Sequence, residues 1–338
     1  MKSWKSLVVA AITLLLLFLF FRNVDLRATL TVLESIPWWL PLVYALSIVG
    51  QYVIRAWRWR VLLRAQKEGI AFRSLFSATV IGFMISYLLP GRIGEVVRPL
   101  LLADREGISR SASLGSIVME RLFDLLAVFL LFLVAIFFFP LPATAPLVTM
   151  RKLVLIILPL IVLFFALLVA LNGPRGAALL ERASAILGRC LPERFRAKGI
   201  GIFRQFLGGM HAGLGWRRLL VILGYSLGLW TFSVLFFWIL MRGFADPTLR
   251  TVTLAGTFAY FGIQFVAAAV PTPGMAGSFD VASRYTLTVL LGVTEGTAVA
   301  YTLLVHFLIL AVPVSLGLWA LGRQGLTLKG MRQLGRSK

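Results

Sequence analysis

Long apolar runs, rather than alternating apolar and polar residues, dominate the chain. Six runs are long enough to cross about 30 Å of hydrocarbon as helices, and they occupy residues 6–21, 38–57, 114–139, 153–171, 219–241 and 297–321. Runs of this length with few charges are typical of transmembrane helices. The pattern therefore predicts an all-α, polytopic membrane protein with six full spans.

Two further apolar stretches are interrupted by Pro and Gly. Residues 74–89 end at Pro90-Gly91, and residues 252–291 are broken at 271–274 by Pro-Thr-Pro-Gly. Pro and Gly end helices, and a broken helix exposed to lipid leaves backbone groups without hydrogen bonds. We therefore expect two re-entrant helical hairpins that are buried in protein or line a cavity. The alternative is that both interruptions are kinks in ordinary spans.

The charge distribution orients these segments. The chain carries 34 Lys and Arg against 13 Asp and Glu, a net charge of +21. Cytoplasmic loops are enriched in Lys and Arg, and residues 175–218 hold nine basic and two acidic residues. If each hairpin enters and leaves from one face, this segment and both termini lie in the cytoplasm. The basic excess is then a topology signal for the cell membrane and an attraction to anionic lipid, so nucleic acid is not an expected partner.

The same topology predicts an inverted repeat within a single integral membrane domain, residues 1–338. Residues 1–139 and 153–321 each read span, span, hairpin, span. An odd number of crossings inverts the second half relative to the first, as in many secondary transporters. Residues 172–218 are predicted to form a basic amphipathic cytoplasmic loop, and residues 322–338 a basic cytoplasmic tail.

The composition excludes several chemistries. The chain has one cysteine, Cys190, and two histidines, His211 and His306, so we expect no intramolecular disulfide and no metal site. The aspartates include no Asp-x-Asp pair for a nucleotide-sugar metal, and no nucleotide-phosphate loop occurs. We expect neither a cofactor nor an enzymatic activity.

The first interruption is followed by charged residues. Two arginines and one carboxylate recur there at three-residue spacing, which predicts that they share a helix face. A glycine between them permits a close approach of two backbones. The residues of this break and the charges after it are Pro90, Gly91, Arg92, Gly94, Glu95 and Arg98.

A second charged group begins the third full span. Glu120 and Asp124 lie one helical turn apart, and Arg121 is spaced to pair with Asp124. Charges at membrane depth must face protein or water. One interpretation is a recess in which arginines hold a lipid phosphate while the carboxylates meet a cationic group or a proton. The other is an ion-pair network that only pins the first hairpin against this span.

The second interruption contains Pro271, Pro273, Gly274 and Gly277. Asp280 and Arg284 follow at a spacing of four, which favours a local salt bridge. His306 lies in the middle of the last span, where we expect a hydrogen-bonded core histidine.

Three motifs, in order, resemble those of the lysylphosphatidylglycerol synthetase/flippase transmembrane-domain family. They are Pro-Gly-Arg-Ile-Gly-Glu-x-x-Arg at 90–98, Glu-Arg-Leu-x-Asp at 120–124 and Pro-Thr-Pro-Gly-x-x-Gly at 271–277. The resemblance implies a flippase-like membrane domain and favours a headgroup-binding role for the charged residues of the first two motifs. Asp280 and His306 stand where the family usually has Glu and often has Arg. Seventeen residues follow Leu321, so we expect neither a counterpart of the synthetase domain of the bifunctional members nor lipid aminoacylation.

These observations together predict a translocase that moves a polar-headed, phosphate-containing lipid between leaflets through a groove lined by the two hairpins. The expected partner is an anionic or zwitterionic phospholipid or a lipid-linked precursor. A membrane-embedded accessory subunit or enzyme of lipid-linked glycan assembly or lipid modification is the alternative. The sequence leaves the lipid, the energy source and homo-oligomerisation open.

The predicted topology can be tested with introduced cysteines. In a Cys190→Ser background, cysteines at Ala143 and Ala245 should react with an impermeant thiol reagent added outside intact cells, because both lie in loops with little basic excess. A cysteine at Ala197, in the most basic loop, should react only after permeabilisation. Labelling at Ala197 in sealed cells would contradict the two-hairpin topology and its inverted repeat.

Overall fold

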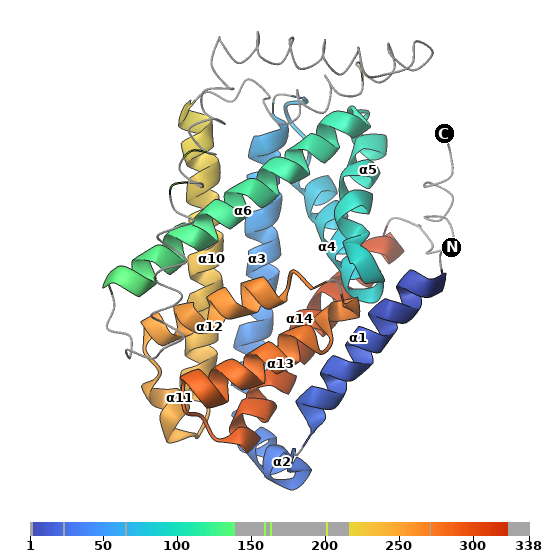
Figure 1. Cartoon of the computed structure of the whole chain (residues 1–338). Helices are drawn as coiled ribbons and strands as arrows, with labels where there is room; N and C mark the ends of the chain where they lie inside the picture. The colour runs from blue at the N-terminus through green and yellow to red at the C-terminus, as the bar shows by residue number, and fades with distance from the viewer. Residues whose placement is uncertain are drawn as a thin grey trace. The chain divides into compact units, whose positions relative to one another are not determined.

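The computed structural model of the chain describes residues 3–22, 24–64, 66–138, 216–270 and 272–323, together with Pro159, Leu163 and Gly201. Every regular element in these ranges is helical (Figure 1), which confirms the predicted all-α class. The longer helices are α1 (Ser3–Phe21), α3 (Trp39–Leu63), α4 (Phe72–Leu88), α5 (Gly94–Glu106), α6 (Arg110–Phe138), α10 (Trp216–Gly243), α12 (Leu254–Ala267) and α14 (Glu295–Arg323). The short elements are α2 (Leu26–Glu34), η1 (Pro90–Arg92), α11 (Pro247–Thr251), η2 (Pro273–Met275), α13 (Ser278–Tyr285) and a π-helix, η3 (Thr286–Leu290).

Three described helices are long and apolar enough to cross a membrane: Trp39–Leu63, Arg217–Gly243 and Glu295–Arg323. They correspond to three of the six predicted spans. Shorter apolar helices occupy Ala10–Phe21, Phe72–Leu88 and Leu254–Ala267. The predicted span at 153–171, the loop at 172–218 and the tail at 322–338 lie wholly or mostly outside the described residues. The full count of six spans and the inverted repeat stay predictions.

The chain divides into two compact units that interleave along the sequence. Unit 1 comprises residues 1–53, 76–98 and 231–338, and unit 2 comprises residues 54–75 and 99–230. Each unit therefore draws on both predicted repeat halves. Helices α3, α4, α5 and α10 each contribute residues to both units.

In unit 1, both Pro/Gly interruptions form breaks between two helices. The first connects α4 to α5 through η1, and the second connects α12 to α13 through η2. In each, a glycine with positive φ is followed by a residue that also has positive φ: Gly91 (78°) and Arg92 (52°), then Gly274 (58°) and Met275 (62°). The two Pro-Gly sequences thus make the same backbone turn, as their similarity predicts.

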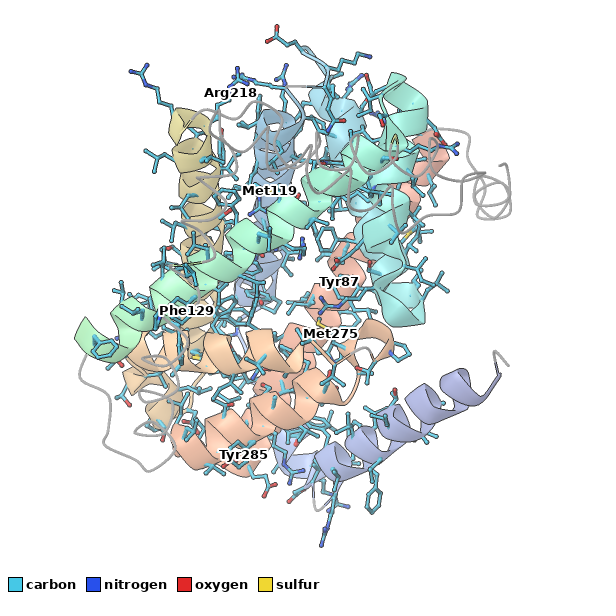
Figure 2. The ribbon with its side chains drawn as sticks, turned by 45° about the horizontal axis from the view of Figure 1, so that its top comes forward. Tyr87, Met119, Phe129, Arg218, Met275 and Tyr285 are labelled. Atoms are coloured by element: carbon cyan, nitrogen blue, oxygen red, sulfur yellow. The ribbon has the colours of Figure 1, made fainter. Side chains whose placement is uncertain are left out.

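The two breaks lie against each other within unit 1. A methyl group placed on Gly274 would lie 3.3 Å from the carbonyl oxygen of Tyr87, at the end of α4. Figure 2 shows Tyr87 close to Met275, the residue after Gly274. The tips of the two hairpins therefore meet. Whether they enter a membrane from opposite faces stays a prediction.

Neighbouring helices hold the second hairpin in place. Its arms α12 and α13 pack on each other, and α13 also packs on α1 and α14 (Figure 1). Gly277, with φ of 81°, begins α13 where the backbone of α1 passes at Leu16. Aromatic rings fill the core behind it, where Tyr260 packs edge to face on Tyr301 with ring centroids 5.9 Å apart.

The arms of the first hairpin approach each other at two glycines. A side chain on Gly94 of α5 would run into the carbonyl oxygen of Gly82 and into Ser86, both on α4. The backbones can therefore come this close only without a Cβ at position 94.

Gly94→Ala should destabilise the protein, because the added methyl group meets backbone that cannot move aside. Overpacking of this kind costs about 1–3 kcal/mol, so the Tm of the detergent-solubilised protein should fall. Gly224→Ala is the matched control, since a methyl group there meets no atom within 4 Å among the described residues. An unchanged Tm for Gly94→Ala would contradict the close approach of α4 and α5.

Candidate functional site

The core of unit 2 contains a group of buried charges. We call it the arginine–carboxylate cluster and define it as Arg55, Arg58, Glu120, Arg121 and Asp124. Arg58 is fully buried, and its Nη1 lies 2.5 Å from Asp124 Oδ1 while its Nη2 lies 3.2 Å from Glu120 Oε1. One guanidinium therefore joins two carboxylates that are themselves removed from solvent.

Asp124 is the residue that most of these contacts share. It lies 3.6 Å from Arg55 Nη1 and 3.4 Å from Arg121 Nη2. Its Oδ1 also accepts a hydrogen bond of 2.9 Å from the Trp230 indole. The Arg58 Nη1 that contacts Asp124 also donates to Ser226 Oγ at 2.6 Å. The cluster thus ties together α3, α6 and α10.

Helical spacing explains why these side chains meet. Arg55 and Arg58 are three residues apart on α3, while Glu120 and Asp124 are four apart on α6, so each pair occupies one face of its helix. The Arg55 guanidinium also lies 4.9 Å from the centroid of the Trp230 ring, a cation–π contact. Two charged stripes therefore face each other and partly neutralise each other.

Arg55 and Arg58 were not among the predicted site residues. The predicted second span ended at residue 57, which left Arg58 outside it. The helix instead continues to Leu63, and the two arginines are buried, at 6% and 0% relative exposure. A signal was present in the sequence, because two arginines three residues apart, one on each side of Trp57, match two carboxylates one turn apart elsewhere in the chain.

The predicted pairing of Arg121 with Asp124 is confirmed, and Arg121 Nη2 also lies 3.0 Å from Glu120 Oε1. Glu120 is ten residues into α6, about 15 Å from the beginning of the helix at 1.5 Å per residue. The Arg121 side chain is 31% exposed, against 7% for Arg55 and 0% for Arg58. Among the cluster arginines, Arg121 is therefore the most exposed.

The first hairpin places its charges differently from the prediction. Arg92 lies in η1, before α5 begins, and its guanidinium donates to the carbonyl of Ala268 at the end of α12. Its Nη1 lies 3.6 Å from Glu95 Oε1. Arg98 is buried, at 3% exposure, and packs over Gly82 of α4. The predicted single helix face for all three residues is wrong, because Arg92 precedes α5 and has a positive φ, whereas Glu95 and Arg98 lie on α5.

The second hairpin also differs from the prediction. Asp280 does not pair with Arg284, because both residues have other partners. Asp280 Oδ1 lies 2.6 Å from His306 Nδ1. Arg284 donates to the carbonyls of Leu19 and Phe20 and pairs with Glu295. Pro273 and Gly274 form the turn itself, and Pro271 lies outside the described residues.

The predicted site residues thus belong to two units. Arg92, Glu95 and Arg98 lie in unit 1, whereas Glu120, Arg121 and Asp124 lie in unit 2. A single recess that contains both sets stays a prediction. Within the described ranges, no three His, Cys, Asp or Glu side chains are grouped so that they could hold a metal ion.

Long apolar helices, a buried charge cluster and two helical hairpins that meet at their breaks define a multi-pass integral membrane protein. The chain matches the family described as the lysylphosphatidylglycerol synthase TM region over residues 5–317, and it belongs to that family. This confirms the resemblance inferred from the three motifs. A search of curated proteins found no match.

Removal of one partner from the cluster should be costly. Arg58→Met leaves Glu120 and Asp124 without the guanidinium that joins them, and breaking a buried ion pair in this way costs about 3–5 kcal/mol. The Tm in detergent should fall clearly below that of the wild type. The matched control is Arg110→Met, which removes an arginine from an exposed pair with Asp104 and should leave the Tm unchanged. A wild-type Tm for Arg58→Met would contradict a structural role of the cluster.

Proposed function

We propose that the chain is a lipid translocase that moves a polar-headed, phosphate-containing lipid between the leaflets of the cell membrane. The observation that carries this proposal is the arginine–carboxylate cluster, which places three guanidinium groups and two carboxylates among apolar helices. Charges at membrane depth are costly and mark pathways for polar substrates. The family to which the chain belongs is named for a synthase of a lysine-bearing phospholipid.

The chemistry of the cluster suits a phospholipid headgroup. Guanidinium groups bind phosphate through two parallel hydrogen bonds, in place of the water that a headgroup loses within the membrane. Arg121, the most exposed arginine of the cluster, offers the first such contact. Glu120 and Asp124 compete with phosphate for the arginines, so the headgroup binds reversibly. The acyl chains stay in the bilayer throughout.

The hairpins supply the moving part in this proposal. Their tips meet in unit 1, and Arg92 links them by donating to the Ala268 carbonyl at the end of α12. A groove between two hairpins is closed while their tips touch and opens when they separate. Secondary transporters work in this way around sites formed by broken helices. In this proposal, the contact between the two tips represents the closed state of the groove.

The alternative function is that of an accessory subunit or enzyme of lipid modification. The family description supports it, because it names this membrane region as part of a synthase. The two functions differ in what the purified chain does alone. A translocase moves lipid without help, whereas an accessory subunit acts only when a second protein is added.

The test is lipid transfer in liposomes that contain the purified protein and fluorescent phospholipids with different headgroups, read as headgroup accessibility to an external quencher. Wild type should increase transfer of at least one phospholipid over protein-free liposomes. Arg121→Lys keeps the charge but loses the fork geometry, and it should slow transfer about tenfold, the factor for losing one charge-assisted hydrogen bond. Arg121 is a better target than Asp124, because Asp124 also holds Arg58 and Trp230.

The matched control is Arg110→Lys, the same substitution in an exposed ion pair at the beginning of α6. It should transfer lipid at the wild-type rate, and both variants should keep the wild-type Tm. Equal transfer by Arg121→Lys and wild type would exclude Arg121 as a headgroup contact. Transfer by none of the proteins until a second protein is added would favour the accessory function.

A further inference from the structure

One imidazole connects the second hairpin to α14. His306 Nδ1 lies 2.6 Å from Asp280 Oδ1, at the beginning of α13, and its Nε2 lies 2.8 Å from the carbonyl oxygen of Gly274, in the turn η2. Asp280 is 3% exposed. The His306 ring therefore joins the turn η2 and the beginning of α13 to α14.

The two contacts of His306 require one more proton than neutral imidazole and carboxylate supply. Both partner atoms are oxygens that accept hydrogen bonds, and a neutral imidazole has a single N–H. Both contacts are satisfied only when a proton is added, either to the second ring nitrogen or to the carboxylate. The carbonyl of Gly274 cannot contribute one.

We propose that Asp280 and His306 form a proton-binding site, and that its proton holds the tip of the second hairpin closed. Without that proton, a nitrogen lone pair of His306 faces an oxygen lone pair at one of the two contacts. Asp280 remains in place, because its Oδ2 accepts the backbone N–H of Gly277 at 2.8 Å. The contact that is lost is the one to Gly274.

The position of Gly274 makes this loss consequential. Gly274 is the turn residue that approaches the Tyr87 carbonyl of the first hairpin, and a methyl group on it would also lie 3.0 Å from Leu310 of α14. Its release frees the point at which the two hairpin tips meet. Loss of the proton at His306 therefore allows η2 to move.

The rest of α13 is held by bonds that do not depend on this proton. Ser283 Oγ lies 2.8 Å from the Tyr260 hydroxyl of α12 and 2.6 Å from Thr302 Oγ1 of α14. These hydroxyl groups join the three helices one turn away from Asp280 and His306. Movement is therefore confined to the tip, and α13 keeps its position.

His306 has a single ionisable hydrogen-bonding partner, because the neighbouring ionisable groups bond elsewhere. Within the described residues, Asp280 is the ionisable side chain at hydrogen-bonding distance from it. Tyr260 on α12 bonds to Ser283, and Arg284 on α13 turns to the carbonyls of α1 and to Glu295 on α14. On the first hairpin, Arg92 bonds to the Ala268 carbonyl and Glu95 pairs with Arg92. The proton is thus shared by the Asp280–His306 pair alone.

A nitroxide spin label at the hairpin tip tests the proposal without any lipid assay. The label is attached to Met275→Cys in a Cys190→Ser background, and its mobility in reconstituted protein is followed by EPR as the pH is raised. The label should be immobile at low pH and mobile at high pH. If a single proton holds the tip, the ratio of mobile to immobile label should rise about tenfold for each pH unit until the transition is complete.

Three variants assign that transition. His306→Gln should abolish the pH dependence, while the matched control His211→Gln should keep it. Asp280→Asn replaces the carboxylate with an amide that can donate to His306 Nδ1, so the neutral ring can still donate from Nε2 to the Gly274 carbonyl. The tip should therefore stay immobile as the pH is raised, and this variant decides the question if His306→Gln does not fold. A label mobility that does not change with pH in the wild type, or a transition that survives in His306→Gln or in Asp280→Asn, would overturn the proposal.

The role of this proton in lipid movement rests on the proposed function, and the two can fail separately. If the label responds to pH but no lipid moves in liposomes at any pH, the proton-binding site stands and the translocase proposal falls. If lipid moves while the mobility of the label does not change with pH, the proposal of a proton-binding site falls and the translocase proposal stands.

Discussion

The contact of Arg58 with Asp124 and Glu120 is the interaction on which unit 2 depends. A guanidinium with no exposed surface is tolerated among apolar helices only when carboxylates and hydrogen-bond acceptors surround it. That requirement fixes the facing sides of α3 and α6 and recruits Ser226 from α10. Charge as well as apolar packing therefore positions the helices that meet at Arg58.

The same constraint shapes the breaks of unit 1. A helix that ends inside an apolar environment leaves carbonyl groups without partners. Arg92 satisfies the Ala268 carbonyl after α12, and His306 satisfies the Gly274 carbonyl in the following turn. The charges near the breaks thus stabilise the broken helices that create the hairpins. A proton on His306 belongs to that structure, which is why its loss affects the position of the tip.

The sequence predicted the features that local spacing determines. Apolar runs gave the helical class, Pro-Gly pairs located both breaks, and the spacing of Arg121 and Asp124 predicted their ion pair correctly. It failed where a distant partner decides. Hydropathy ended a span at residue 57, because it cannot recognise that carboxylates more than sixty residues away neutralise Arg58. Helical spacing likewise favoured Asp280–Arg284, while the actual partner of Asp280 is His306, 26 residues further along.

The central claim is that the arginine–carboxylate cluster contacts a lipid phosphate, and headgroup crosslinking tests it most directly. A phospholipid with a photoreactive group next to its phosphate is added to the reconstituted protein, and the crosslinked residues are located by peptide mass spectrometry. The account predicts crosslinks centred on Arg121 and on the neighbouring turns of α3 and α6, which weaken in Arg121→Gln. Crosslinks confined to exposed apolar positions such as Phe307 and Leu318, and unchanged in Arg121→Gln, would contradict it.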